Sequence, residues 1–118
     1  MKDKPQEHER MLHIIQAIDK ILHYTDGIDY EAFCNHEMMK DAVMRNFEIV
    51  GEAAYHISNE TKRKYSEVEW KAIQAFRHIL AHDYYEINLE RLWSIKEKYV
   101  EALKEDMKVI LKEEYDID

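Results

Sequence analysis

The 118-residue sequence contains little of what interrupts a helix, with only 2 glycines and 1 proline. Sheet proteins need turn-forming residues between their strands, so this scarcity argues against a β-sheet architecture. Hydrophobic residues make up 46% of the chain, which is enough for a core and argues against disorder. The composition therefore predicts an all-α fold, and the length predicts a single domain over residues 1–118.

Cysteine and long apolar runs are also scarce. The single cysteine, Cys34, excludes an intrachain disulfide and a cysteine cluster for zinc, and we expect it to be buried and inert. No apolar stretch approaches the roughly 20 residues of a membrane span. The charged segment 1–10 does not resemble a signal peptide. We therefore expect a cytoplasmic protein that makes no use of a membrane.

Positive charge is in deficit, because 25 acidic residues oppose 17 basic ones and the formal net charge is -8. Contacts to phosphates need clustered lysine and arginine, which argues against a broad basic surface for DNA. A small local site for nucleic acid remains open, and so does a more basic protein partner.

The first half of the chain shows helical spacing of apolar residues. The pattern predicts a helix from after Pro5 to about Tyr24, stopped by the turn at 25–27, and a short helix that Asp29 caps and that runs through Phe33.

A long third helix is predicted over about 36–59, with Asn35 as its cap. Gly51 lies inside this helix, where glycine costs about 1 kcal/mol relative to alanine. The usual compensation is the close approach of another helix, either within the bundle or across a dimer.

The segment 61–65 is expected to be a basic connector, in which Lys62, Arg63 and Lys64 are solvated or contact RNA backbone. Ser66 and Glu69 have the spacing of a capping box for a fourth helix over about 68–82.

The C-terminal region predicts a turn at 83–87, then one long helix that Asn88 caps, and a frayed acidic tail over 113–118. The whole chain is therefore expected to form an up-and-down bundle of four to five helices.

The fourth helix carries the candidate chemistry. On a helical wheel, Ile73 and Phe76 fall on the core side with Ala72, whereas Arg77 and His82 lie on the opposite side, about 140° apart. Trp70, Gln74, His78 and Ala81 share that second side. From spacing alone, a solvated helix face is the better interpretation. His78 and His82 could bind a metal as an i, i+4 pair, but no third ligand is obvious beyond Asp83, so no metal site is predicted.

The segment 77–84 matches the R-x4-H-x-Y signature and resembles the HEPN superfamily, most closely its HepT-like branch of small toxins. Three further segments resemble the same family in the same order: 41–54 in the long helix, 70–73 at the start of the signature helix, and 88–93 at the start of the last helix.

The resemblance implies a HEPN-type bundle with a metal-independent endoribonuclease activity and no cofactor. It implies a homodimer whose two signature helices form a composite cleft, with transfer RNA or messenger RNA as substrate. It also implies a toxin–antitoxin pair of type VII, in which an MntA-like nucleotidyltransferase antitoxin adds AMP to the signature tyrosine, here Tyr84, and it leaves open a larger hetero-oligomer of toxin and antitoxin.

The residue types in the signature suit the chemistry of RNA cleavage. RNA carries its own nucleophile, the 2′-hydroxyl. His82 can take or give a proton near neutral pH, and Arg77 can grip the scissile phosphate. His78 fits the polar position that follows the arginine in the family. Tyr84 would instead simply pack at a helix end if the resemblance did not apply.

Two other functions remain open: a HEPN subunit without nuclease activity that serves a nucleotidyltransferase partner, and a plain helical scaffold. The polar side of the third helix, with Arg45, Glu48 and Glu52, either lines the cleft or dimer interface or forms ordinary surface ion pairs. Trp70 and Trp93 are expected to pack rather than to stack on bases.

Overall fold

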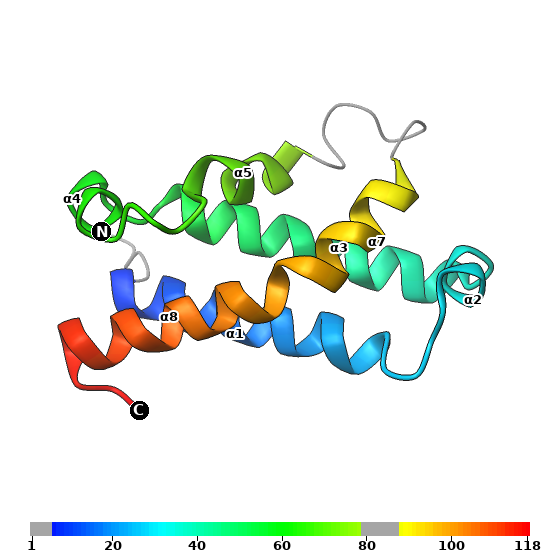
Figure 1. Ribbon diagram of the computed structural model, residues 1–118, viewed down its shortest axis with the longest axis horizontal. Coiled ribbons are helices and arrows are strands. Elements are labelled where there is room, and N and C mark those ends of the chain that lie inside the picture. The colour runs from blue at the N-terminus through cyan, green and yellow to red at the C-terminus, as the bar shows by residue number, and fades with distance from the viewer. Residues whose placement is uncertain (1–5, 79–87) are drawn as a thin grey trace, which may run out of the picture.

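The computed structural model describes residues 6–78 and 88–118, which form helices joined by turns and contain no strand. This confirms the all-α fold. Three long helices follow the long axis of the molecule (Figure 1): α1 (Glu7–Tyr24), α3 (Glu37–Tyr55) and α8 (Val100–Tyr115). α1 packs against both of the others and forms the centre of the bundle.

Shorter helices complete the described structure: α2 (Tyr30–Cys34), α4 (Asn59–Lys64), α5 (Trp70–Gln74), the 3-10 turn η1 (Ala75–His78) and α7 (Leu89–Lys98). α5 and η1 lie along α3, opposite the side that α1 covers (Figure 1). The described residues thus contain more helices than the four to five predicted, because the predicted connector forms the helix α4 and the predicted C-terminal helix is divided.

The caps of Asp29 and Asn88 were predicted correctly, and each acts within its own turn. Asp29 accepts a hydrogen bond from the backbone N–H of Ala32 at 2.8 Å, and Asn88 accepts one from Arg91 at 2.9 Å. α1 ends at Tyr24, and Gly27 in the following turn has a φ of 71°. These caps need only neighbours in sequence.

Two predicted caps are wrong. Asn35 ends α2, and its side-chain amide donates to the carbonyl of Glu31, while His36 caps α3 by accepting from the N–H of Met39 at 3.1 Å. The capping box of Ser66 and Glu69 does not form, because Glu69 precedes α5 without a side-chain hydrogen bond.

The segment expected to be a basic connector is the helix α4. α3 ends at Tyr55 rather than near residue 59, and Ser58 then starts α4 by accepting a hydrogen bond from the N–H of Thr61 at 3.2 Å. Glu7 of α1 accepts a hydrogen bond from the N–H of Ser58 at 2.7 Å. The cap of Ser58 is a local signal that the sequence-based prediction missed, and the contact from Glu7 adds to it.

The predicted long C-terminal helix is broken at Tyr99, whose backbone (φ -122°, ψ -27°) departs from helical geometry. The bend lets Leu92 of α7 and Leu103 of α8 both reach the core. The acidic tail is helical through Tyr115 rather than frayed, and Asp116 ends α8 in a left-handed conformation.

The fourth predicted helix is described only as far as His78, and the predicted turn at 83–87 lies outside the described residues. Ile73 and Phe76 are buried as predicted, but Ala72 is exposed and Trp70 is buried, contrary to the wheel. Trp70 and Ile73 are three residues apart in α5 and so share one face of that helix, which packs against α3 and buries both.

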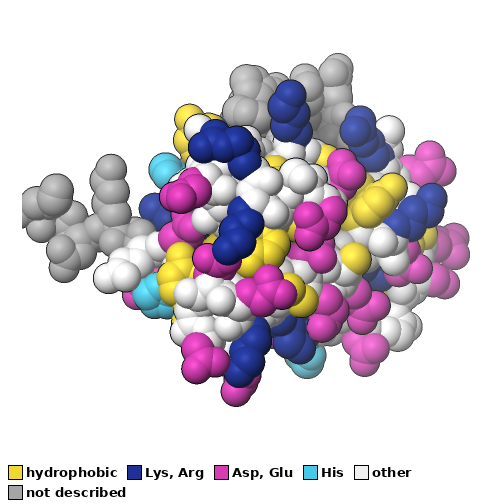
Figure 2. All heavy atoms as spheres, turned by 60° about the vertical axis from the view of Figure 1, so that its left-hand side comes forward, with side chains coloured by type: hydrophobic (Ala, Val, Ile, Leu, Met, Phe, Trp, Pro, Cys, Tyr) yellow, Lys and Arg dark blue, Asp and Glu magenta, His cyan; other side chains and the backbone are white. Residues whose placement is uncertain are grey.

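Acidic and basic side chains are intermingled on the face of the molecule shown in Figure 2. This agrees with the prediction that a broad basic surface is lacking. Within residues 6–78 and 88–118, none of the helices combines the length and the apolar character that crossing a bilayer requires.

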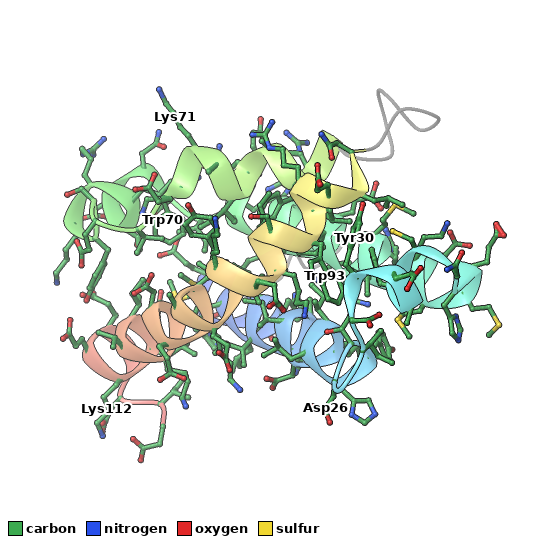
Figure 3. The ribbon with its side chains drawn as sticks, turned by 45° about the vertical axis from the view of Figure 1, so that its right-hand side comes forward. Asp26, Tyr30, Trp70, Lys71, Trp93 and Lys112 are labelled. Carbon is green, nitrogen blue, oxygen red and sulfur yellow. The ribbon has the colours of Figure 1, made fainter. Side chains whose placement is uncertain are left out.

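Both tryptophans pack within the protein. Trp70 points inward while Lys71 points away from the bundle (Figure 3), and the indole N–H of Trp70 donates to the carbonyl of Tyr65 at 3.0 Å. Trp93 packs against Phe33 with ring centroids 5.0 Å apart, and the ammonium of Lys96 lies 3.9 Å from its centroid. Cys34 is only partly buried, so the expected burial is wrong in degree.

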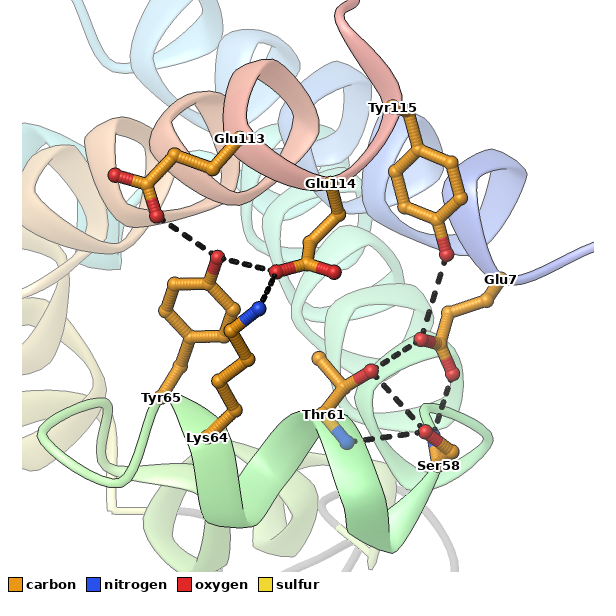
Figure 4. A network of polar contacts seen from close by, with 8 residues as sticks. All are labelled: Glu7, Ser58, Thr61, Lys64, Tyr65, Glu113, Glu114 and Tyr115. Atoms are coloured by element: carbon orange, nitrogen blue, oxygen red, sulfur yellow. Dashed lines mark hydrogen bonds and ion pairs between the residues drawn. The ribbon is translucent and has the colours of Figure 1, made fainter.

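A polar network ties α4 to both ends of the chain (Figure 4). Glu7 contacts Ser58 and the hydroxyl of Thr61, and the hydroxyl of Tyr65 lies 2.8 Å from a carboxylate oxygen of Glu113 and of Glu114. Burial pushes the pKa of Glu7 up, but the hydrogen bonds from Thr61 and Ser58 outweigh it, and the pKa falls below its ordinary value of 4.5.

Replacing Glu7 by glutamine should therefore destabilise the protein in a pH-dependent way. Because the pKa is lower in the folded state, the carboxylate stabilises the fold above pH 4.5, and this contribution disappears as the pH falls through the folded value. At neutral pH we expect a loss of about 1 kcal/mol, reduced by partial exposure. Urea unfolding of both proteins at a series of pH values measures this difference in the free energy of unfolding.

The matched control is Glu105→Gln, since Glu105 is exposed and makes only a long contact of 3.6 Å to Lys108. Its unfolding free energy should stay close to that of the wild type at every pH. A Glu7→Gln deficit that remained constant into acid would show that the carboxylate charge is not what stabilises α4.

Candidate functional site

The backbone of Arg77 passes directly over Gly51 of α3. A methyl group added at Gly51 would lie 2.3 Å from the backbone nitrogen of Arg77 and 2.9 Å from the carbonyl carbon of Phe76. Only glycine allows this approach, since real Cβ atoms essentially never come within 3.0 Å of another heavy atom. The close contact expected for Gly51 is therefore found inside the bundle.

The guanidinium of Arg77 is held from two sides by α3. Its Nε donates to a carboxylate oxygen of Glu52 at 3.2 Å, and its Cζ lies 3.8 Å from the ring centroid of Tyr55. The side chain is 28% exposed, so it remains open to a ligand. A guanidinium has five N–H donors, and the contact through Nε leaves the four on its Nη atoms directed elsewhere.

Glu52 is shared between two basic side chains. Its other carboxylate oxygen lies 2.9 Å from Nε2 of His56, one turn further along α3. The pKa of Glu52 is lowered, mainly by the hydrogen bond with His56 and then by Arg77, against a smaller opposing effect of burial. Glu52 thus stays ionised and offsets the charge of Arg77.

A groove of about 280 Å³ lies between α1 and α3 next to this cluster. Arg45 and Glu48 form an ion pair of 2.8 Å on its α3 side. Arg45, Glu48 and Glu52 therefore make the ion pairs of one interpretation and also line this groove, while a place for them in the cleft or dimer interface stays a prediction. Its complete lining is Arg10, His13, Arg45, Glu48, Ile49, Glu52 and Ala53.

The basic residues of α4 are mostly occupied by the protein itself. Lys64 pairs with Glu114 at 2.5 Å, and Lys62 donates to the carbonyl of Tyr55 at 3.4 Å. Burial lowers the pKa of Lys62, although Glu7 opposes this. These contacts favour a structural role for Lys62 and Lys64 over RNA binding.

Arg77 is the signature residue whose side chain the structure places. His78 belongs to η1 by its backbone, whereas His82, Asp83 and Tyr84 lie outside the described residues. Among the residues that are described, no three His, Cys, Asp or Glu side chains are grouped so that they could hold a metal ion.

The sequence interpretation missed Tyr55 and His56 as neighbours of the site. A signal for them exists, because Glu52, Tyr55 and His56 have i, i+3 and i, i+4 spacing and so share one face of α3. Arg10 and His13 were also missed, and no local signal could identify them, since they reach the groove from another helix.

Comparison with known proteins gives a consistent result. The sequence model described as "Ribonuclease HepT-like" matches residues 14–110, which is most of the chain. A protein of Methanocaldococcus jannaschii named "Putative RNase MJ1380" is 34% identical over 97 residues, which cover 82% of this chain and 89% of the relative. "Probable ribonuclease HepT" of Thermococcus cleftensis is 33% identical over 91 residues, covering 77% of this chain and 83% of that protein.

A third relative, "Putative RNase TTE0752" of Caldanaerobacter subterraneus, is 32% identical over 102 residues, which cover 86% of this chain and 91% of the relative. No solved structure gives a significant match. The matched region contains Gly51, Glu52 and Arg77, so the cluster described above lies within the part that the relatives share.

Proposed function

The chain belongs to the HepT-like ribonuclease family, and we propose that it is a metal-independent endoribonuclease. The observation that carries the proposal is the guanidinium of Arg77, which Glu52 and Tyr55 hold while 28% of the side chain stays exposed. Arginine binds phosphate oxygens through paired donors, and it keeps its charge at any physiological pH. The names of the relatives supply the substrate class, RNA.

The reaction needs no metal in principle, because RNA provides the attacking 2′-hydroxyl. A base removes the 2′ proton, the 2′ oxygen bonds to phosphorus, and the bond from phosphorus to the 5′ oxygen breaks as an acid protonates the leaving oxygen. The products are a cyclic phosphate and a 5′-hydroxyl. We assign Arg77 to the phosphate and His82 to the proton transfers, with His78 in support.

A homodimer completes the proposal. One His82 cannot be base and acid at the same moment, whereas two copies related by a two-fold axis would bring both into one cleft. The groove side of α3 lies beside Arg77 and is polar and partly exposed, which suits a surface near such a cleft.

The proposed activity predicts RNA cleavage in the presence of a chelator, and Arg77→Ala should reduce it by about 10²–10³-fold, as for loss of one group that stabilises the developing charge. Purified protein is incubated with total RNA and EDTA, and fragments are resolved on a gel. Lys108→Ala, at an exposed position of α8, is the control and should cleave normally. Cleavage that required added metal, or survived Arg77→Ala, would contradict the proposal.

We further propose that a nucleotidyltransferase antitoxin silences the enzyme by adding AMP to Tyr84. The modification adds a bulky anion two residues from His82, which would block RNA by size and repulsion. Tyr84→Phe should remain active when the antitoxin and ATP are present, whereas the wild type loses activity. Tyr85→Phe is the matched control. If mass spectrometry found AMP on Tyr85, the modified residue would be Tyr85 instead of Tyr84.

A further inference from the structure

The groove between α1 and α3 has the composition of a nucleotide site. Arg10, His13 and Arg45 offer nitrogen donors, and Glu48 and Glu52 offer acceptors. A nucleotide needs both, because its phosphate is an anion and its base edges carry N–H donors as well as acceptors. Ile49 and Ala53 add apolar surface suited to the flat face of a base.

The size of the groove limits what it can take. Pockets for drug-sized ligands usually measure about 300–1,000 Å³, and this groove, at about 280 Å³, falls just below that range. A single nucleotide suits it better than a folded element of another protein. Arg45 is 66% exposed on its side chain even though it pairs with Glu48, so a phosphate can approach it from solvent.

The charges around the groove favour an anion despite the acidic chain. Within the lining, Arg10 and Arg45 balance Glu48 and Glu52, whereas the whole chain has a net charge of -8, and the neighbouring Arg77, which does not line the groove, gives its surroundings an excess of one positive charge. Protonation of His13 would increase this excess. A local cationic excess on an acidic protein directs a polyanion to one place.

The groove is connected to the proposed catalytic surface through one side chain. Glu52 lines the groove and accepts the hydrogen bond from Arg77. A strand whose scissile phosphate sits at Arg77 would therefore carry its next nucleotide toward Arg45 and Arg10. We propose that this groove is a subsite for the RNA nucleotide that flanks the cleaved phosphate, an inference that rests on the proposed ribonuclease function.

The first test compares substrates of different length. Arg10→Gln and Arg45→Gln should each lower kcat/KM for long RNA by about tenfold and reduce the salt slope of RNA binding by about 1. Cleavage of dinucleoside monophosphates, which carry no flanking phosphate, should be unchanged. Lys20→Gln is the control, because Lys20 is exposed on α1 and does not line the groove. Equal losses on both kinds of substrate would overturn the subsite.

The second test does not depend on cleavage. A short 2′-O-methylated RNA, which lacks the nucleophile, is titrated into isotope-labelled protein. The Nε–H signals of Arg10 and Arg45 and the methyl signals of Ile49 should shift, and Arg10→Gln with Arg45→Gln should weaken binding by about tenfold or more. Shifts elsewhere, with none at these residues, would overturn the subsite.

The two tests separate the subsite from the function itself. Loss of cleavage in Arg77→Ala together with full activity of both groove variants would leave the ribonuclease intact and remove the subsite. A 2′-O-methylated RNA that shifts the groove signals, together with an unmodified RNA that is not cut, would support binding at the groove and contradict the enzyme. A change of molecular mass in the groove variants, with RNA binding unaltered, would instead make the groove an interface between copies of the chain.

Discussion

Replacing His82 by alanine should lower the rate of RNA cleavage by about 10²–10⁴-fold, the range that general acid–base groups contribute. An imidazole titrates near neutral pH, so it can accept the proton of the 2′-hydroxyl in one state and protonate the leaving oxygen in the other. Alanine can do neither. Arg77 and the RNA-binding surface remain in this variant, so RNA should still bind while kcat falls.

The loss must be separated from unfolding. The predicted position of His82 is on the face of its helix opposite the core, so the thermal midpoint of His82→Ala should stay close to that of the wild type. His23→Ala is the control, because His23 is exposed at the end of α1 and its ring packs only against that of Tyr24 among the described contacts. Full activity of pure His82→Ala protein would remove the assignment.

A mixed dimer tests whether two copies share the cleft. If one His82 is the base and its counterpart the acid, a dimer with one His82→Ala subunit should be as inactive as the double variant. If each subunit works alone, the mixed dimer should keep about half the activity. The pH–rate profile gives an independent check, since a base and an acid together produce a bell-shaped curve.

Much of the fold could be predicted from the sequence where the cause is local. The apolar stripe of α3 gives its buried residues Val43, Phe47 and Val50, and the caps Asp29 and Asn88 act within their own turns. α4 was missed although its cap, Ser58, acts within its own turn. The contacts that Glu7 adds at its start could not be predicted, because Glu7 lies more than fifty residues earlier in the chain.

The candidate site, like the fold, could be predicted from the sequence only where its contacts are local. Arg77 could be found from its signature, and Glu52 and Tyr55 share one face of a predicted helix. The groove needs the packing of α1 on α3, which brings Arg10 and His13 opposite Arg45. Spacing within a helix cannot predict such a pairing across helices, nor the change from α-helical to 3-10 geometry at Ala75.

Gly51→Ala should damage both the stability of the protein and its activity. A helix interior normally gains about 1 kcal/mol from this change. Here the added methyl group would lie 2.3 Å from the nitrogen of Arg77, whereas ordinary contacts begin at 3.4 Å, so the backbone of η1 must move by about 1 Å. Overpacking of this kind costs about 1–3 kcal/mol, which leaves a net loss of up to about 2 kcal/mol.

The effect on activity should exceed the effect on stability. Displacing η1 moves the guanidinium of Arg77 away from Glu52 and Tyr55, and an error of about 1 Å at a catalytic group can cost about 10²-fold in rate. A second substitution cannot easily relieve the clash, since the two nearest atoms belong to the backbone of Arg77 and Phe76. We therefore expect slow cleavage even at temperatures where Gly51→Ala is fully folded.

Gly27→Ala separates the two effects. Gly27 has a φ of 71° with no atom within 4 Å of an added methyl group, so alanine there strains the backbone by about 1–2 kcal/mol without a clash. It should lower the thermal midpoint about as much as Gly51→Ala while cleavage stays normal. Circular dichroism melts give the thermal midpoints of both variants, and RNA cleavage assays give their activities. Equal activities would show that the contact between Gly51 and Arg77 serves the fold alone, and a more stable, fully active Gly51→Ala would show that η1 can leave α3 without cost.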